Sequence, residues 1–117
     1  MSRRLLYPLI SVDVALFCVQ DDVLQVLLVQ RANEPLKHQW ALPGGLLQPD
    51  VDVNLEAAAL RVLSEKLTVK VPHVAQVAAF SGAGRDPRGW SVAALHCALL
   101  PQDQVQAVRM PKVKRFE

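Results

Sequence analysis

The sequence predicts one mixed α/β (or α+β) domain, in which a single β-sheet has helical cover. Its 117 residues suffice for one hydrophobic core and are too few for two ordinary domains. Apolar, β-branched segments flank one segment of strong helix formers, so the expected order is strand, strand, helix, strand, strand. That order favours a mixed sheet covered by the helix.

The first half of the chain predicts a β-hairpin followed by a glycine turn. Residues 8–20 and 23–30 are rich in apolar and β-branched types, and Asp21-Asp22 between them form a tight turn. After a polar loop over residues 31–39, the segment Pro43-Gly44-Gly45 predicts a sharp turn at which the backbone can approach another group closely.

The middle of the chain contains the one convincing helix. Asn54 or Asp52 can cap it, and residues 55–67 are good helix formers. Its leucines form an apolar stripe suited to packing on a sheet.

Two further strands are expected at residues 73–80 and 91–100, on either side of a glycine- and arginine-rich loop over 81–90. Residues 113–116 resemble the start of another strand. With only one strong helix, the second face of the sheet lacks cover, so either a partner covers that face or the native protein continues beyond Glu117; we expect the second.

Composition and charge argue against several classes of protein. The net charge is only +2, and we expect the basic cluster of Lys112, Lys114 and Arg115 to be a solvated tail, with no direct nucleic-acid binding by this segment. No apolar stretch is long enough for a membrane span, and we expect no secretory signal in the N-terminal residues. Cys18 and Cys97 are expected to be free thiols, which favours the cytoplasm.

The most informative stretch runs from Trp40 to Val69, WALPGGLLQPDVDVNLEAAALRVLSEKLTV. It resembles the Nudix box, in which a glycine loop and a helix carrying Arg-Glu-U-x-Glu-Glu (U being aliphatic) bind Mg²⁺ and a nucleoside diphosphate. The resemblance implies a Nudix fold, with a mixed sheet and the 54–67 helix beside the glycine loop. Mg²⁺ needs several oxygen ligands, and helix positions three and four apart bring carboxylates together on one face.

The box departs from this pattern where the metal would bind. Counted from Arg61, the box has glutamates at three positions, where this sequence has Val62, Glu65 and Lys66. The glycine that the box has at the helix exit is replaced by Thr68. One carboxylate beside an ammonium group is a poor Mg²⁺ site, so the sequence argues against ordinary hydrolysis. Glu65 is the one remaining candidate for a metal ligand or catalytic group. Three other acids offer an alternative route to a metal site: Asp50, Asp52 and Glu56.

The altered box and a second motif resemble a more specific group. The altered box reads R-x-L-x-E-K-x-x-V, and the second motif is RDPRGWSV at residues 85–92. Together they look like the Nudix-related transcriptional regulators of NAD metabolism. In that family a Nudix-like domain senses ADP-ribose or a relative, and a separate winged-helix domain, absent from this chain, binds DNA. The RDPRGW segment also resembles ADP-ribose pyrophosphatases, so it indicates the ligand class more than the activity.

These patterns nominate a set of ligand-binding residues. Lys66 is the sharpest hypothesis: its ammonium would replace the metal and contact the diphosphate directly, although a helix lysine can also simply face water. Arg61 either pairs with Glu65 to organise the box or is a solvated helix residue. The other candidates are Arg31, Gly44, Gly45, Arg85 and Arg88.

Three structural alternatives remain open for this set. Asp86 can pair with Arg88, the glycines can form a turn with no ligand, and Trp40 and Trp90 can stack on a base or lie in the core.

The function expected from the sequence is a sensor that binds ADP-ribose or a related nucleoside diphosphate with little or no hydrolysis. Binding would require no cofactor, whereas catalysis would require Mg²⁺. A homodimer is expected from the family resemblance. The alternatives are a divergent Nudix pyrophosphohydrolase that acts on ADP-ribose-like nucleoside diphosphates with a divalent metal, and an interaction module that has lost the ligand.

Overall fold

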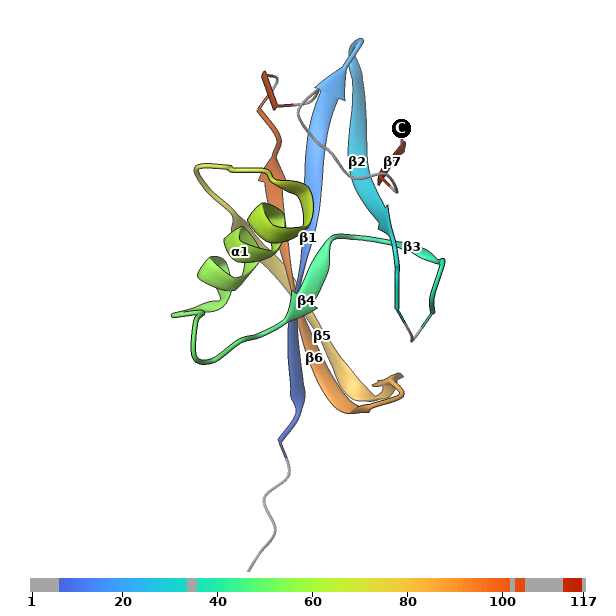
Figure 1. Ribbon diagram of the computed structural model, residues 1–117, viewed down its shortest axis with the longest axis vertical. Helices are drawn as coiled ribbons and strands as arrows, with labels where there is room; N and C mark the ends of the chain where they lie inside the picture. Colours follow the sequence, from blue (N-terminus) through green and yellow to red (C-terminus); the bar gives the residue numbers. More distant parts are fainter. Residues whose placement is uncertain (1–6, 34–35, 102, 105–112, 117) are drawn as a thin grey trace, which may run out of the picture.

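The computed structural model describes residues 7–33, 36–101, 103–104 and 113–116, the last four as backbone only. It contains a mixed sheet of seven strands and one α-helix, α1, which covers one face of the sheet (Figure 1). The central path of the sheet is β3-β2-β1-β6-β5, and β4 and β7 pair with β1 and β2. The bounds are β1 Leu9–Gln20, β2 Val23–Gln30, β3 Trp40–Ala41, β4 Gly44–Leu46, α1 Leu55–Leu67, β5 Ala75–Asp86, β6 Gly89–Leu99 and β7 Val113–Phe116.

The first hairpin agrees with the prediction from the sequence. Asp21 and Asp22 both have positive φ, 53° and 62°. A two-residue turn of that kind matches the twist of the flanking strands, and aspartate tolerates it better than a β-branched residue does. The turn fixes the register of β1 on β2, with Gln20 opposite Val23.

Strand β1 organises the sheet because it pairs along both edges. It runs parallel to β6 from Leu9 to Phe17, while its other edge pairs antiparallel first with β4 and then with β2. Side chains alternate between the faces of a strand, so β1 presents Val12 and Val14 to α1 and presents Ser11 and Asp13 to the opposite face.

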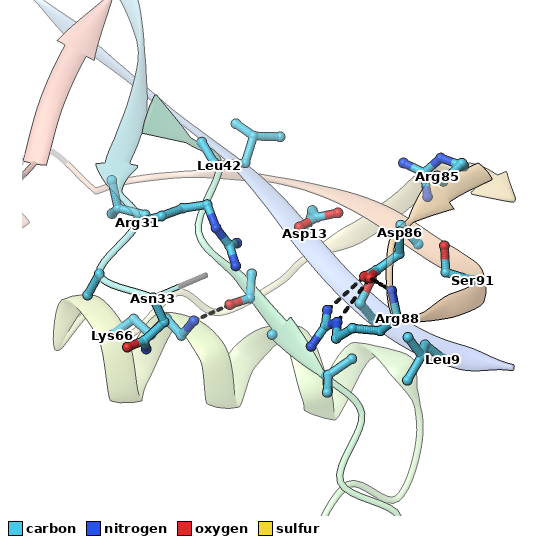
Figure 2. Close-up of a pocket in the computed structure, with 18 of the residues that line it drawn as sticks. Leu9, Asp13, Arg31, Asn33, Leu42, Lys66, Arg85, Asp86, Arg88 and Ser91 are labelled. Carbon is cyan, nitrogen blue, oxygen red and sulfur yellow. Dashed lines mark hydrogen bonds and ion pairs between the residues drawn. The ribbon is translucent and has the colours of Figure 1, made fainter. Parts of the chain in front are cut away.

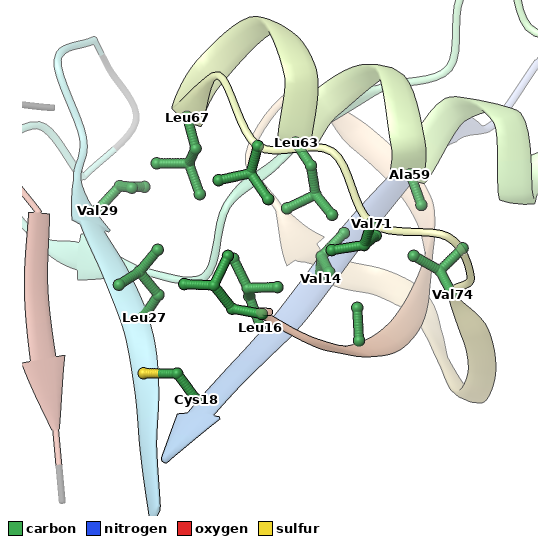
Figure 3. Close-up of a cluster of buried hydrophobic side chains, with 13 residues drawn as sticks. Val14, Leu16, Cys18, Leu27, Val29, Ala59, Leu63, Leu67, Val71 and Val74 are labelled. Atoms are coloured by element: carbon green, nitrogen blue, oxygen red, sulfur yellow. The ribbon is translucent and has the colours of Figure 1, made fainter. Parts of the chain in front are cut away.

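Helix α1 begins and ends as its sequence predicts. The Asn54 side chain accepts a hydrogen bond from Ala57 N at 2.8 Å, which caps the first turn. At the other end the backbone of Thr68 is left-handed (φ 56°), and its N–H donates hydrogen bonds to carbonyl oxygens of the last helical turn. Ala59, Leu63 and neighbouring helix residues pack on the core side chains of β1 and β2 (Figure 3). This packing fixes the position of the helix beside β4.

The structure corrects two predictions about loops. Gly44 and Gly45 do not form a sharp turn, since they lie in β4 with negative φ. The expected loop over 81–90 is mostly strand: β5 extends to Asp86 and β6 begins at Gly89. Glycines and arginines weaken a strand signal, but pairing with β6 outweighs that local preference.

The C-terminal part of the described chain is also ordered differently from the prediction. Residues 113–116 form β7, as expected, and pair with β2. Lys114 and Arg115 therefore belong to a strand and not to an irregular tail, while Lys112 lies outside the described residues. Cys18 and Cys97 are free cysteines, as predicted. Within the described ranges, no helix combines the length and apolar character needed to cross a membrane.

Candidate functional site

A cleft of about 880 Å³ lies on the face of β1 opposite the α1 core. Alternate residues of β1 (Leu9, Ser11 and Asp13) and of β6 (Ser91 and Ala93) line it. Four cationic side chains surround these positions, with Asp13 between them in Figure 2. They are Arg31, Lys66, Arg85 and Arg88.

The predicted site residues therefore converge in three dimensions, with one exception. Gly44, Gly45 and Glu65 also line the cleft, whereas Arg61 is not among its lining residues. A cluster of cations around an open cleft suits an anionic ligand such as a diphosphate.

Gly44 is required by close packing and not by a turn. A Cβ built on Gly44 would lie 2.2 Å from Asp13 Oδ1 and 2.8 Å from the backbone oxygen of Val12. At Gly45, a Cβ would meet Val62 Cγ2 at 3.4 Å and Lys66 Nζ at 4.0 Å. The two glycines thus let β4 approach β1 on one side and leave room for Lys66 on the other.

Lys66 connects the helix to the glycine strand. Its Nζ donates a hydrogen bond to the carbonyl oxygen of Gly44 (Figure 2). Burial lowers the pKa of Lys66, and the nearby Arg31 and Arg61 lower it further, while Asp13 and Glu65 oppose the shift. An anionic ligand in the cleft would stabilise the charged form of this lysine.

Arg61 holds the segment between β4 and α1 in place. Its guanidinium donates to Asp52 Oδ1 at 2.7 Å and Oδ2 at 2.9 Å, to Glu65 Oε2 at 3.1 Å and to the Leu46 carbonyl at 3.1 Å. These hydrogen bonds lower the pKa of Asp52, whose side chain is 1% exposed, and raise that of Arg61. The solvated alternative for Arg61 is therefore wrong, and the predicted pair with Glu65 is present alongside a stronger one with Asp52.

The hairpin between β5 and β6 contributes Arg85, Asp86 and Arg88. Asp86 accepts from Arg88 Nε at 3.0 Å and Nη2 at 2.7 Å, which lowers the pKa of Asp86 to about 2. The pairing left open by the sequence is thus present. Arg85 lies over the Phe80 ring, 5.8 Å from its centroid. An irregular register between Gly82 and Asp86 brings these charged side chains to the cleft.

The residues present do not fit the Mg²⁺ that the family resemblance implies. Within the described part of the chain, no three Asp, Glu, His or Cys side chains are grouped so that they could hold a metal ion. Lys66 contacts the Gly44 carbonyl, and Glu65 is paired with Arg61. Asp52, one of the acids considered for an alternative metal site, is likewise held by Arg61.

The sequence reasoning missed Asp13 and Ser91. Asp13 lines the cleft, and burial raises its pKa although Arg85, Lys66 and Arg31 act in the opposite direction. The available signal for Asp13 was the polar residues at alternate positions of an otherwise apolar strand, S-V-D-V in β1. Trp40 and Trp90 are 38% and 49% exposed, so neither is a core residue, and neither lines the cleft. Their stacking on a base stays a prediction.

Comparison with known proteins agrees with this geometry. Residues 10–112 match the NUDIX domain family. The chain is 48% identical over 103 residues to the ADPR responsive transcriptional repressor NtrR of Acinetobacter baylyi, a match that covers 85% of this chain and 41% of the repressor. It is 35% identical over 88 residues to the ADP-ribose pyrophosphatase of Methanocaldococcus jannaschii, with 74% of this chain and 48% of the enzyme covered.

A solved structure is similar across nearly the whole chain. It is the NUDIX domain of Shewanella oneidensis NrtR complexed with ADP ribose, with a TM-score of 0.81 and 39% identity over 96% of this chain and 74% of that domain. The chain spans less than half the length of the two relatives matched by sequence. The family match, the sheet topology and the altered box agree, and the chain belongs to the NUDIX domain family.

Proposed function

We propose that this domain is a sensor that binds ADP-ribose or a closely related nucleoside diphosphate without a metal ion and with little or no hydrolysis. The observation that carries the proposal is the contact between Lys66 and the Gly44 carbonyl inside the cationic cleft. The similarity to an ADPR responsive repressor and to a NUDIX domain complexed with ADP ribose supports the choice of ligand.

The diphosphate is assigned to the cations of the cleft. Lys66 is fixed at the junction of α1 and β4, where it presents a positive charge next to a backbone carbonyl. Arg31 faces the same cleft from the end of β2, and its charge lowers the pKa of Lys66. Two phosphate groups placed between these side chains would relieve their mutual repulsion, which favours binding of a diphosphate at this end of the cleft.

The test is calorimetric titration with ADP-ribose in EDTA, for the wild type and for Lys66→Glu. A hydrogen bond to a charged group contributes about 1.5–3 kcal/mol, so we expect Lys66→Glu to weaken binding at least roughly tenfold. Lys70→Glu makes the same charge change outside the cleft and should leave the affinity close to that of the wild type.

Two results would contradict parts of this proposal. Binding that requires magnesium, or steady release of AMP that Glu65→Gln abolishes, would identify the domain as a working pyrophosphohydrolase and refute the sensor proposal. Equal affinities for Lys66→Glu and Lys70→Glu would refute the role of Lys66 while leaving the ligand in place.

The assembly and location of the protein belong to the same proposal. We place the domain in a cytoplasmic homodimer, in which a DNA-binding part of a longer protein would respond to the nucleotide. The similarity to a transcriptional repressor of more than twice the matched length supports this assignment. Light scattering of the purified protein tests the dimer, and a monomer at micromolar concentration would contradict it.

A further inference from the structure

We propose that the hydroxyl of Ser91 binds a ribose hydroxyl of the nucleotide and so forms a sugar subsite at the hairpin side of the cleft. This inference rests on the proposed function, because it assigns a second part of the same ligand. Ser91 would therefore contribute to specificity for the sugar, whereas the cations of the cleft bind the phosphates.

The first argument is that Ser91 is buried without a partner. Only 5% of the residue is exposed, and its Oγ makes no hydrogen bond to any described residue. A buried hydroxyl that lacks a partner is costly, and most such groups in native proteins are satisfied by protein, water or ligand. Because Ser91 also lines the cleft, a bound molecule can supply that partner.

The second argument is the space around this hydroxyl. Ser91 pairs with Leu9 of β1 on one side and with Gly82 of β5 on the other. Gly82 has a φ of 150°, and an added Cβ there would meet only Arg85 Cγ, at 3.8 Å. On its own strand the next residue on the same face is Ala93. Small and aliphatic neighbours leave room for a compact polar group such as a sugar ring.

The third argument is the distribution of charge, which separates phosphate from sugar. Ser91 lies on the β6 side of the cleft near Asp86, while Lys66 and Arg31 lie on the opposite side, beyond Asp13 (Figure 2). On the Ser91 side the charge of Arg88 is compensated by its ion pair with Asp86, and Arg85 lies over the Phe80 ring. The Asp13 carboxylate, between the two sides of the cleft, accepts hydrogen bonds from hydroxyl groups but repels phosphate. A ligand with phosphates at Lys66 therefore directs a hydroxyl-bearing part toward Ser91.

ADP-ribose carries two ribose rings, and calorimetry on two ligands tells them apart. Titrations in EDTA with ADP-ribose and with ADP compare the wild type, Ser91→Ala and the control Ser81→Ala, an exposed serine of β5 that does not line the cleft. We expect Ser91→Ala to lower the affinity for ADP-ribose roughly 2- to 10-fold, the range of one neutral hydrogen bond, and Ser81→Ala to leave it unchanged.

The ligand dependence then identifies the ring. A loss confined to ADP-ribose assigns Ser91 to the terminal ribose. An equal loss of affinity for ADP assigns the Ser91 hydroxyl to the ribose of adenosine. In that case, an ADP analogue that lacks the contacted hydroxyl must bind the wild type and Ser91→Ala with equal affinity. A 2′-deoxy and a 3′-deoxy ADP that both remain sensitive to Ser91→Ala would overturn the sugar assignment.

Stability provides an independent readout. Removing a buried hydroxyl that has no partner should leave the melting temperature of the unliganded protein unchanged or raise it, so a clear decrease would overturn the argument. If ADP-ribose binds and Ser91→Ala changes neither affinity, the subsite is refuted and the sensor function stands. If the wild type binds neither nucleotide, the proposed function itself fails.

Discussion

Replacing Gly44 by alanine tests the close approach of β4 to β1 on which the cleft depends. The added Cβ would lie 2.2 Å from Asp13 Oδ1 and 2.8 Å from Val12 O. The aspartate side chain can rotate away, but the Val12 oxygen is backbone in a strand that pairs along both edges. The strands must therefore separate, and the Gly44 carbonyl moves away from Lys66.

The expected loss of stability follows from overpacking. Inserting a methyl group into a packed site costs about 1–3 kcal/mol. For a domain of this size that lowers the melting temperature by roughly 4–12 °C. Gly45→Ala is the matched control, because its Cβ meets nothing closer than 3.4 Å. Alanine is favoured over glycine within a strand by roughly 0.5–1 kcal/mol, so Gly45→Ala should melt at or slightly above the wild-type temperature.

Differential scanning calorimetry of the three proteins measures this difference, and titration with ADP-ribose measures its effect on the cleft. Gly44→Ala should be both less stable and weaker in binding. If the two alanine variants have the same melting temperature, the close approach of β4 to β1 does not exclude a side chain at position 44, and the argument from packing is wrong.

Two further predictions concern the hairpin and the helix. The pKa of Asp86 should be about 2 in a carboxyl titration followed by NMR, and Arg88→Gln should return it toward the ordinary value of 3.8. Because folding lowers this pKa, the stabilising effect of the pair is complete above pH 4 and is lost as the pH falls from about 4 to about 2; an unchanged Asp86 titration in Arg88→Gln would contradict the assignment. Asn54→Ala should destabilise the domain by about 0.5–2 kcal/mol in thermal denaturation, since it removes the cap on Ala57 N, whereas Asn54→Asp should retain most of the stability.

The altered box has a physical consequence that extends beyond lost metal ligands. Val62 is 1% exposed and packs with Val12 and Ala58, so the position expected to hold a glutamate now belongs to the core. A carboxylate there would be buried among apolar groups at a high desolvation cost. Restoring a metal site would therefore require repacking of the helix against β1 in addition to Lys66→Glu.

Local patterns in the sequence were sufficient for the hairpin and the helix. The run of apolar residues on either side of Asp21-Asp22, and the Asn54 cap followed by good helix formers, specify backbone geometry within a few residues along the chain. The degenerate box was equally visible, since it depends on which residues follow Arg61 within one helical turn. The box predicted the NUDIX family, which is confirmed, and the box together with the RDPRGW segment predicted the ligand class.

Only the tertiary structure decided how distant segments share the cleft. Asp13 and Ser91 are far apart in sequence, and the parallel register of β1 on β6 places both on the face that lines the cleft. The antiparallel pairing of β5 with β6 extends β5 to Asp86 and turns most of an expected loop into strand. Pairing with a neighbouring strand supplies hydrogen bonds and packing that a short segment cannot encode alone, so Gly44, Asp13 and Ser91 acquire their roles from the strands beside them.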